Sequence, residues 1–321
     1  MAANIARHAS IVRAAIETSE AAKSAIVASW RRSAVQHNLD PANLQLPTRL
    51  SETEFVAARQ QMEPLIRAAQ ASLDRLYLAV CGTGCCVLLA DGNGISVERR
   101  GAAVDDDVFE SWGLWTGSVW REDVEGTNGI GTSLAVDRAI TIDRDQHYLS
   151  RNTNLSCAAA PIYDCCGDIA GVLNVSSCRA DLTDRFLNLI SMAVCDAAQR
   201  IEADNFRHSF SKERILIVPT SNRTSAALLA VDRDDVVVGA TRLARAVLGI
   251  TGKALESSPS LMSLIGGDLH QPNDLKGAER AVLERALACS EGNVTAAARS
   301  LGISRATFHR KICRHSLKIR R

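Results

Sequence analysis

The stretch AERAVLERALACSEGNVTAAARSLGISRATFHRKICRHSLK, residues 278–318, decides the fold of the C-terminal part. Apolar residues at helical spacing predict a first helix that ends at the break Glu291-Gly292-Asn293. Thr295 is expected to cap a short, Ala-rich second helix. Gly302 is expected to make a tight turn, and Ser304 to cap a third helix. The pattern therefore predicts three short helices.

The third helix has two different faces. Phe308 and Ile312, four residues apart, are expected to point together into the core, while long donors that could reach bases and phosphates lie opposite: Arg305, Thr307, His309 and Arg310. Residues 274–321 hold eleven Lys and Arg against four Asp and Glu, a charge of +7 in a chain whose net charge is +1. A basic helix-turn-helix on an acidic body favours double-stranded DNA as a partner. The alternative is a three-helix cap whose basic face only meets solvent.

The run GNVTAAARSLGISRATFHRKI resembles the C-terminal helix-turn-helix of Fis-type proteins and of sigma-54 enhancer-binding activators. His309 stands where that family often has Arg, and Phe308 where it usually has Leu. The resemblance implies DNA contacts at matching positions: Asn293, Thr295, Ser304, Arg305, Thr307, His309, Arg310 and Lys311.

Length and composition indicate a chain of two or three packed domains. It has 321 residues, of which 46% are hydrophobic and 4% aromatic. No run of eighteen apolar residues predicts a membrane span, and the first twenty residues do not read as a secretory signal. The expected location is the cytoplasm, where ten cysteines are expected to stay reduced.

The N-terminal part is predicted to be helical. Residues 9–36 are predicted to form one helix, which the break at 38–41 ends. Ser51 and Glu54 form a capping box for a second helix, in which Pro64 is expected to introduce a kink.

Residues from Leu78 onward predict strands and turns. Strands are expected at 85–90 and 95–99 around an Asp-Gly-Asn-Gly turn, and at 157–163 and 168–176 around the turn at 164–167. Short and long helices are predicted at 145–150 and 182–206. Antiparallel strands with flanking helices predict an α+β sensor fold.

This part of the chain resembles the GAF domain of AcoR-type regulators. The matching pieces, in the family's order from about residue 29 to 205, are Ser29-Trp30-Arg31-Arg32-Ser33, Leu39-Asp40-Pro41, GTNGIGTSLA, Asp145-Gln146-His147-Tyr148, CAAAPIYD and GVLNVSS. The resemblance implies a buried pocket for a small effector, whose class in the family includes alcohols, ketones and aromatics. Each candidate ligand-binding residue also has an interpretation in packing or turn formation: Trp112, Trp115, Trp120, Asn128, Thr132, His147 and Cys157.

The cysteines leave two interpretations open. Neighbouring residues such as Cys85-Cys86 and Cys165-Cys166 do not suit an ordinary disulfide, and no paired C-x2-C spacing predicts a metal site. Buried thiols that act as small hydrophobes are therefore expected, with no cofactor and no metal. Cys81, Cys85, Cys157 and Cys178 could still meet in space, which leaves redox or metal sensing as the alternative.

The interval before the C-terminal helices is short. Residues 226–264 predict two strands and a helix capped by Thr241, similar to the opening of a PAS domain. The sigma-54 activators carry an AAA+ ATPase in this interval, and the resemblance therefore implies a regulator that lacks that domain. Gly249–Ala254 does not fit G-x4-G-K-[ST], so no ATPase is predicted.

The predicted domains are an N-terminal helical region (1–72), a GAF-like sensor (73–206), a PAS-like coupling segment (207–265), a linker (266–273) and a Fis-type helix-turn-helix (274–321). They predict a ligand-responsive transcriptional regulator that binds DNA as a homodimer, meets no membrane and could contact RNA polymerase. One alternative is an architectural DNA-bending protein with a vestigial sensor. Another, an enzyme that uses His147 and a cysteine, has no orienting carboxylate in the sequence to support it, so no catalytic residue is predicted.

Overall fold

The computed structural model describes residues 2–17, 24–80, 84–220, 227–251, 255, 259–265, 279–280, 282–283, 286–287, 290 and 293–315. Contacts divide the chain into two units, Met1–Ile265 and Gly266–Arg321. The predicted linker, Cys81, the Glu291-Gly292 break and residues 252–254 of the rejected phosphate loop lie outside the described ranges. No helix within those ranges is long and apolar enough to span a membrane.

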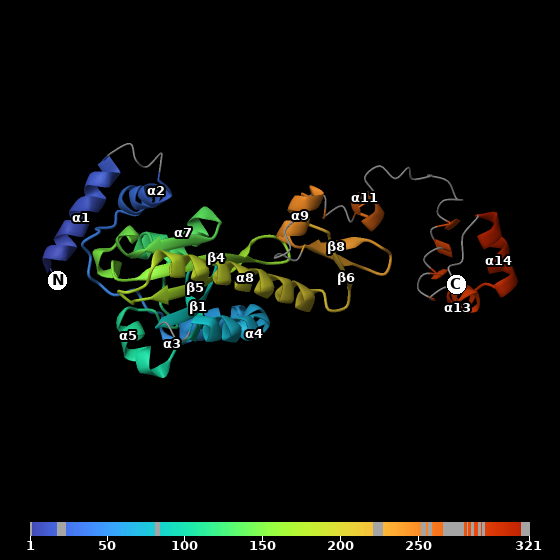
Figure 1. The fold of residues 1–321 in the computed structure, drawn as a ribbon, viewed down its shortest axis with the longest axis horizontal. Coiled ribbons are helices and arrows are strands. Elements are labelled where there is room, and N and C mark those ends of the chain that lie inside the picture. Colours follow the sequence, from blue (N-terminus) through green and yellow to red (C-terminus); the bar gives the residue numbers. More distant parts are fainter. Residues whose placement is uncertain are drawn as a thin grey trace. The chain divides into compact units, whose positions relative to one another are not determined.

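An antiparallel five-stranded sheet in the order β2-β1-β5-β4-β3 forms the centre of the first unit (Figure 1). Its strands are β1 (Cys85–Asp91), β2 (Ser96–Arg100), β3 (Ile140–Asp143), β4 (Ser156–Tyr163) and β5 (Ile169–Ser177). The β1–β2 and β4–β5 hairpins confirm both predicted strand pairs. The fold class is α+β, as the pattern of elements predicts.

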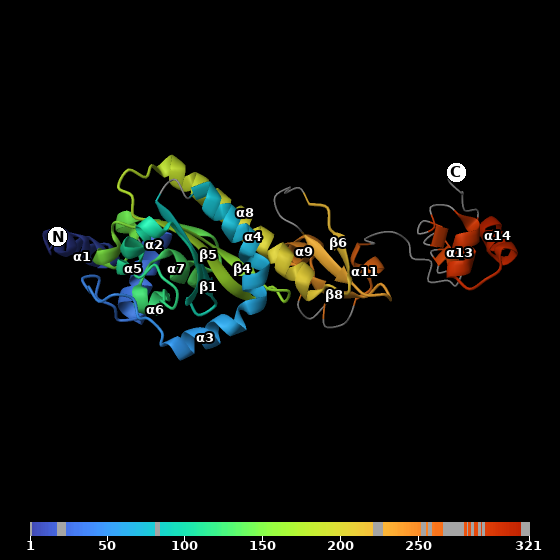
Figure 2. The same ribbon diagram turned by 90° about the horizontal axis from the view of Figure 1, so that it is seen from below.

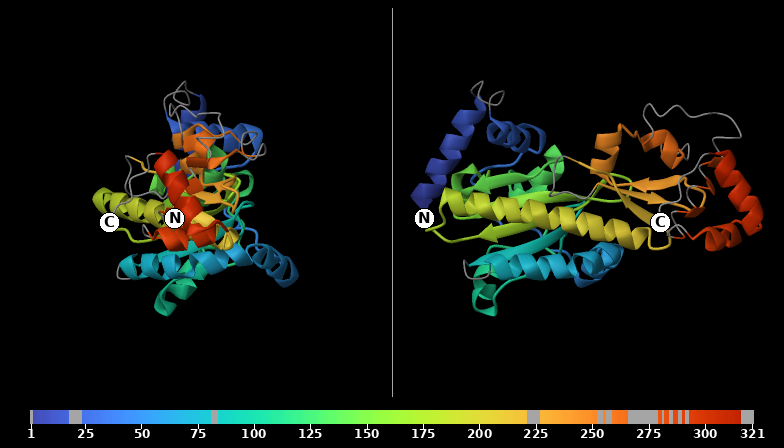
Figure 3. Two further views of the ribbon diagram at one scale, coloured as in Figure 1. Left: turned by 90° about the vertical axis from the view of Figure 1, so that its right-hand side faces the viewer. Right: turned by 45° about the vertical axis from the view of Figure 1, so that its right-hand side comes forward.

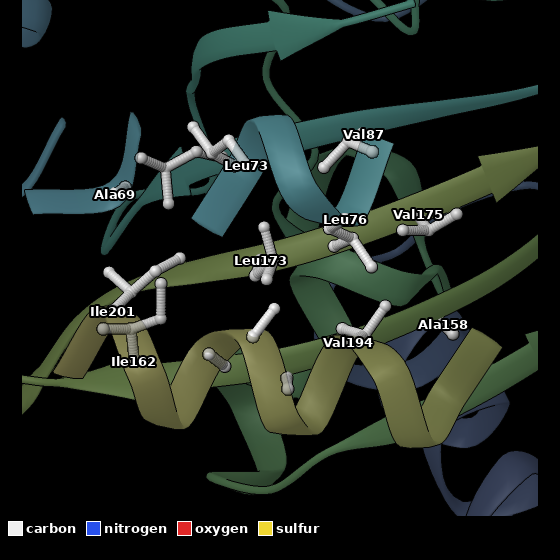
Figure 4. Packing of buried hydrophobic residues seen from close by; sticks show 14 of the residues in the cluster. Ala69, Leu73, Leu76, Val87, Ala158, Ile162, Leu173, Val175, Val194 and Ile201 are labelled. Atoms are coloured by element: carbon white, nitrogen blue, oxygen red, sulfur yellow. The ribbon is translucent and has the colours of Figure 1, made fainter. Parts of the chain in front are cut away.

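Two long helices, α4 (Glu63–Val80) and α8 (Asp184–Ser209), cover one face of this sheet. They lie side by side over the strands (Figure 2). Alternate strand residues such as Val87, Leu173 and Val175 meet Leu73 and Leu76 of α4 (Figure 4). The period of two in each strand therefore divides its buried side chains between the face that these helices cover and the opposite face.

The other face of the sheet lies under short elements and loops. These are the 3-10 turn η4 (Ala103–Asp105), α5 (Asp106–Ser111), α6 (Glu122–Glu125) and α7 (Gly129–Val136). The helix predicted at 145–150 is wrong: two 3-10 turns, η5 (Arg144–Gln146) and η6 (Ser150–Asn152), flank an extended His147. The backbone amide of His147 closes η5 by donating to the carbonyl of Arg144, and the extended ψ of 144° at His147 then ends the turn, so a continuous helix does not form.

The N-terminal region consists of several helices, where one was predicted over 9–36. They are α1 (Ala2–Glu17), α2 (Ala25–Arg31) and a π-helical turn η2 (Arg32–Gln36). Ser24 starts α2 afresh by accepting a hydrogen bond from the amide of Val27, and α1 packs beside α2. The capping box of Ser51 and Glu54 is confirmed at the start of α3 (Glu52–Gln61), which Met62 separates from α4.

Helix α8 continues from the five-stranded sheet to a second sheet (Figure 3, right). That sheet has the order β6-β7-β8, with β6 (Arg214–Ile217), β7 (Leu228–Val231) and β8 (Val237–Ala240). The predicted cap Thr241 is confirmed at the start of α9 (Arg242–Leu248), and α11 (Leu261–Ile265) follows. Strand β6 was not predicted, because its side chains are exposed or half-buried and show no clear alternation.

In the second unit, α13 (Val294–Ser300) and α14 (Arg305–Arg314) form the predicted helix pair. Phe308 and Ile312 are buried against Ala297 and Ala298, which confirms the core face. The predicted cap at Thr295 is wrong. Asn293 caps α13 instead, since its side-chain oxygen accepts hydrogen bonds from the amides of Thr295 and Ala296.

Candidate DNA-binding and ligand sites

Local chemistry fixes the start and the orientation of α14. Gly302 adopts a φ of +65°, which ends α13 without the strain that a Cβ would bring. Ser304 then accepts a hydrogen bond from the amide of Thr307 at 3.1 Å. With Phe308 0% exposed on the core side, the opposite side of α14 must face outward.

That outward face carries the predicted base-reading residues. Arg305, His309 and Arg310 are exposed, and Thr307 is half-buried with its hydroxyl 2.9 Å from Ser304 Oγ. No described acidic side chain forms an ion pair with either arginine. Asn293 and Thr295 are also exposed, at the start of α13.

Lys311 has a partner within the unit. Its ammonium pairs with Glu279, and His315 Nε2 lies 2.8 Å from the other carboxylate oxygen. The hydrogen bond from Lys311, followed by that from His315, lowers the pKa of Glu279 to about 2. These contacts tie Glu279 to α14, a role for Lys311 that the sequence pattern did not indicate.

In the sensor, three predicted ligand residues bond to their own backbone surroundings. Trp120 Nε1 donates to the carbonyl of Gly113 at 3.0 Å. Asn128 donates to the carbonyls of Trp120 and Gly126 and accepts from the amide of Gly131, while Thr132 accepts from the amide of Asn128. These side chains fix the loop before α7.

The glycines of GTNGIG allow this loop to approach the sheet. A Cβ on Gly131 would lie 2.4 Å from the carbonyl oxygen of Trp120. A Cβ on Gly129 would lie 2.6 Å from Asn174 Oδ1 and 3.0 Å from the Cβ of Cys157. The motif therefore packs α7 against β4 and β5, as glycine does where backbones meet closely.

His147 and Cys157 lie next to each other in the same core. His147 Nε2 is 3.5 Å from Cys157 Sγ, and His147 Nδ1 is 3.0 Å from the carbonyl of Arg144. A carbonyl only accepts, so Nδ1 carries the proton and Nε2 accepts from the thiol. Burial lowers the pKa of His147 to about 4 and raises that of Cys157 to about 11. Both groups are neutral, the reverse of an activated thiolate pair.

The remaining tryptophans lie in different surroundings. The Trp115 ring stacks under the guanidinium of Arg99, 4.2 Å from the ring centre. Trp112 lines a cavity of about 300 Å³ with apolar and polar side chains from α1, the loop before α3, the end of α5, and η6 with the two residues after it: Asn4, Ile5, Leu44, Leu46, Ser111, Ser150, Arg151, Thr153 and Asn154. The structure therefore does not gather all seven predicted ligand residues at one cavity.

The SWRRS motif joins the N-terminal helices to the sensor, a role that sequence reasoning did not assign. Ser29 bonds to Glu122 and lies 2.7 Å from Thr127 Oγ1, and Arg32 pairs with Glu122 at 2.9 Å. Trp30 Nε1 donates to the carbonyl of Gln146 at 2.8 Å. A serine and an arginine three residues apart lie on one helix face, so both side chains can reach the same acidic partner.

The described cysteines form no disulfide with one another. Burial raises the pKa of Cys86 far above its ordinary value and also raises those of Cys165, Cys178 and Cys195. Within the described ranges, no three or more His, Cys, Asp or Glu side chains are grouped to hold a metal ion. This arrangement favours packing roles for these thiols.

Two family models match the chain. The model described as "MimR, N-terminal domain" matches residues 1–202, more than half of the chain, and the model described as "Bacterial regulatory protein, Fis family" matches residues 275–315.

Curated relatives are longer than this chain. The acetoin catabolism regulatory protein of Cupriavidus necator is 30% identical over 224 residues, which cover 68% of this chain and 34% of the relative. The propane 2-monooxygenase operon transcriptional activator MimR of Mycolicibacterium smegmatis is 28% identical over 225 residues, which cover 68% of this chain and 36% of the relative. The chain thus spans about a third of the length of these relatives.

Among solved structures, the E. coli DhaR(N)–DhaL complex contains a chain with a similar fold. The TM-score is 0.52 at 15% sequence identity, over 74% of this chain and 80% of that chain. At this identity the likeness concerns the fold alone.

Proposed function

This chain belongs to the family of proteins with a MimR N-terminal domain, and on that premise we propose that it is a ligand-responsive, DNA-binding transcriptional regulator. Relatives with regulatory names and the Fis-family match at residues 275–315 support this function. The observation that carries it is the outward face of α14, where Arg305 and Arg310 stand exposed on a helix whose other side is buried. Such a helix fits the major groove of DNA.

The test is fluorescence anisotropy on the full chain with a DNA site selected from a random pool and a scrambled site of equal length. Arg305→Ala should weaken binding to the selected site by about 1–3 kcal/mol and bring its affinity closer to that of the scrambled site. Arg314→Ala, a change at an exposed arginine in the last turn of the same helix, is the matched control and should affect both sites alike. Equal, steeply salt-dependent affinity for both sites in the wild type would instead support the architectural alternative.

We propose that the chain binds DNA as a homodimer, in which the recognition helix of each copy contacts one of two half-sites. Helix α8 exposes Leu189 by 60% and Met192 by 66%, and these residues lie three apart on one face. An apolar pair on a long helix suits a contact between two copies, which would set the spacing of two recognition helices. Leu189→Glu with Met192→Glu should give monomers in sedimentation, and Leu78→Glu on α4 is the exposed control.

The small effector is proposed to bind in the cavity that Trp112 lines. Its apolar side chains, together with Ser111, Arg151, Thr153 and Asn154, provide the mixture of surfaces that small neutral compounds use. A panel of 2-butanone, 2-butanol and phenol tests this by tryptophan fluorescence. Trp112→Phe should remove the response to any compound that binds, and Trp115→Phe should keep it, since Trp115 stacks under Arg99.

We infer no enzymatic activity for this chain. The neutral pair of His147 and Cys157 is not arranged for nucleophilic attack, and the interval between the sensor and α13 holds a short three-stranded sheet where sigma-54 activators carry an ATPase. ATP hydrolysis by the purified chain, abolished by Lys253→Ala, would overturn this inference.

A further inference from the structure

A second cavity, of about 350 Å³, lies between the sensor and the three-stranded segment. Strand β4, helix α8 and helix α9 each supply part of its wall. Small apolar side chains make up much of the wall: Ala139, Ala160, Pro161, Ala198, Leu243 and Ala246. Among the polar residues that complete it are Tyr163, Glu202 and Arg242. The volume suits a compact ligand of small-molecule size.

The cationic side chain of Arg242 at this cavity already has partners within the protein. Arg242 forms two hydrogen bonds of 2.9 Å to the carboxylate of Asp137, and its guanidinium stacks over the Tyr163 ring at 4.0 Å. The Tyr163 hydroxyl also donates to Asp137, at 2.9 Å. The guanidinium of Arg242 therefore hydrogen-bonds a carboxylate through two nitrogens and stacks its planar face on an aromatic ring, so both of its usual modes of interaction are used.

The carboxyl group at this cavity has no such partner. Glu202 is half-buried, and no described basic side chain forms an ion pair with it. Burial raises the pKa of Glu202 to about 7, against the opposing effects of the Tyr163 backbone and Arg242. Cys195 also faces the cavity from α8, with its own pKa raised by burial. A half-buried carboxylate beside an apolar wall is stabilised by a ligand that combines a cationic group with an apolar part.

We propose that this cavity is a second small-molecule site, which binds a compact, mostly apolar compound with one primary ammonium group, and that the ammonium pairs with the Glu202 carboxylate. The apolar body of the compound contacts Ala160, Ala198 and Leu243. Because α8 belongs to the sensor and α9 to the next segment, an occupant contacts both and stabilises their present arrangement. This site is separate from the Trp112 cavity and does not depend on the effector proposed to bind there.

The test is isothermal titration of the full chain with isobutylammonium chloride, with isobutanol and sodium isobutyrate as matched probes. Isobutylammonium should bind, and the two probes of the same shape should not. Because Glu202 must be ionised to pair, the affinity should rise about tenfold between pH 6 and pH 8. Equal binding of isobutanol, absence of isobutylammonium binding, or an affinity that does not change with pH would overturn the proposal.

Variants identify the residue. Glu202→Gln should abolish isobutylammonium binding, while Asp204→Asn removes a carboxylate from the same helix away from the cavity and should leave it intact. Ala246→Leu should block the cavity without touching Glu202. Binding that survives Glu202→Gln would contradict the assignment. Anisotropy on the selected DNA site, recorded for each variant, separates a failure of this site from a failure of DNA binding.

Discussion

The two faces of the five-stranded sheet are built from the same strands but are covered differently. The face under α4 and α8 presents residues such as Val87, Leu173 and Val175, in a continuous apolar core. The other face presents the apolar Leu88 and Val172 and also the polar Asn174 and Ser176, which alternate with Leu173 and Val175 along β5. The first face is therefore held by a continuous apolar core, and the second by an apolar core that buried polar side chains and close glycine contacts interrupt.

The largest effect is expected on the apolar face. Leu73 on α4 is 1% exposed, so Leu73→Ala should leave a cavity and lower the free energy of unfolding by about 2–5 kcal/mol. Chemical denaturation measures this loss. Leu78→Ala, on the same helix but 72% exposed, is the control and should change stability by less than about 0.5 kcal/mol. Similar losses in both variants would mean that this face does not depend on burial.

A steric change tests the other face. Gly131→Ala places a Cβ 2.4 Å from the Trp120 carbonyl oxygen, and backbone must move to relieve the contact. We expect a loss of about 1–3 kcal/mol by denaturation, although alanine favours a helix over glycine by about 1 kcal/mol. Gly92→Ala, whose Cβ would lie 3.6 Å from its nearest neighbour, should be tolerated. If Gly131→Ala is as stable as the wild type, the loop has more room than the contact indicates.

A polar change on that face should have a smaller effect. Ser176 Oγ accepts the amide hydrogen of Asn174 at 2.8 Å, while Asn174 Oδ1 has no hydrogen-bond partner among the described residues. Ser176→Ala therefore leaves the buried amide of Asn174 without its acceptor, at an expected cost of about 1 to 2 kcal/mol. Ser111→Ala is the exposed control. A gain in stability would show that Asn174 finds another acceptor.

The smallest effect is the pH dependence from His147. Burial lowers its pKa to about 4 from 6.5, so between these values the unfolded chain binds the proton and the folded chain does not. The contribution of His147 to stability is present above pH 6.5 and is lost as pH falls toward 4. Between pH 6.5 and 5.5 this amounts to about 1 kcal/mol.

The measurement compares thermal melts of the wild type and His147→Gln across that range. Glu125 and Glu202, whose pKa values burial raises to about 7, act in the opposite direction between pH 4.5 and 7, so only the difference between the two proteins isolates His147. A difference that stays constant with pH would mean that the pKa of His147 is the same in the folded and the unfolded chain.

Local signals made much of the fold predictable. The short apolar run of β1 and its turn, the turn between β4 and β5, the capping box of Ser51, and the caps at Ser304 and Thr241 all depend on residues within a few positions of one another. The same reasoning missed Ser24 as the start of α2, because an apolar stripe at 9–36 is equally consistent with one helix or two.

The sites were less predictable, since they depend on contacts between distant residues. Asn128 and Thr132 serve the loop that holds them, and only the structure shows that their hydrogen-bonding groups are used there. The residues that line the cavity at Glu202 are spread over positions 139 to 246, so no short sequence motif could predict it. The described part of the C-terminal unit follows local rules, which is why its outward face could be predicted from α14 alone.

Helix α8 belongs to two cores at once. Ile190, Val194 and Ile201 pack in the core of the five-stranded sheet, and five residues after Ile201, Phe206 packs against Leu228 and Ala230 of the second sheet. Its 26 residues, about 39 Å long, are one continuous hydrogen-bonded element. Local unfolding of α8 in one core therefore also exposes apolar residues of the other core. The two sheets are for this reason parts of a single cooperative folding unit.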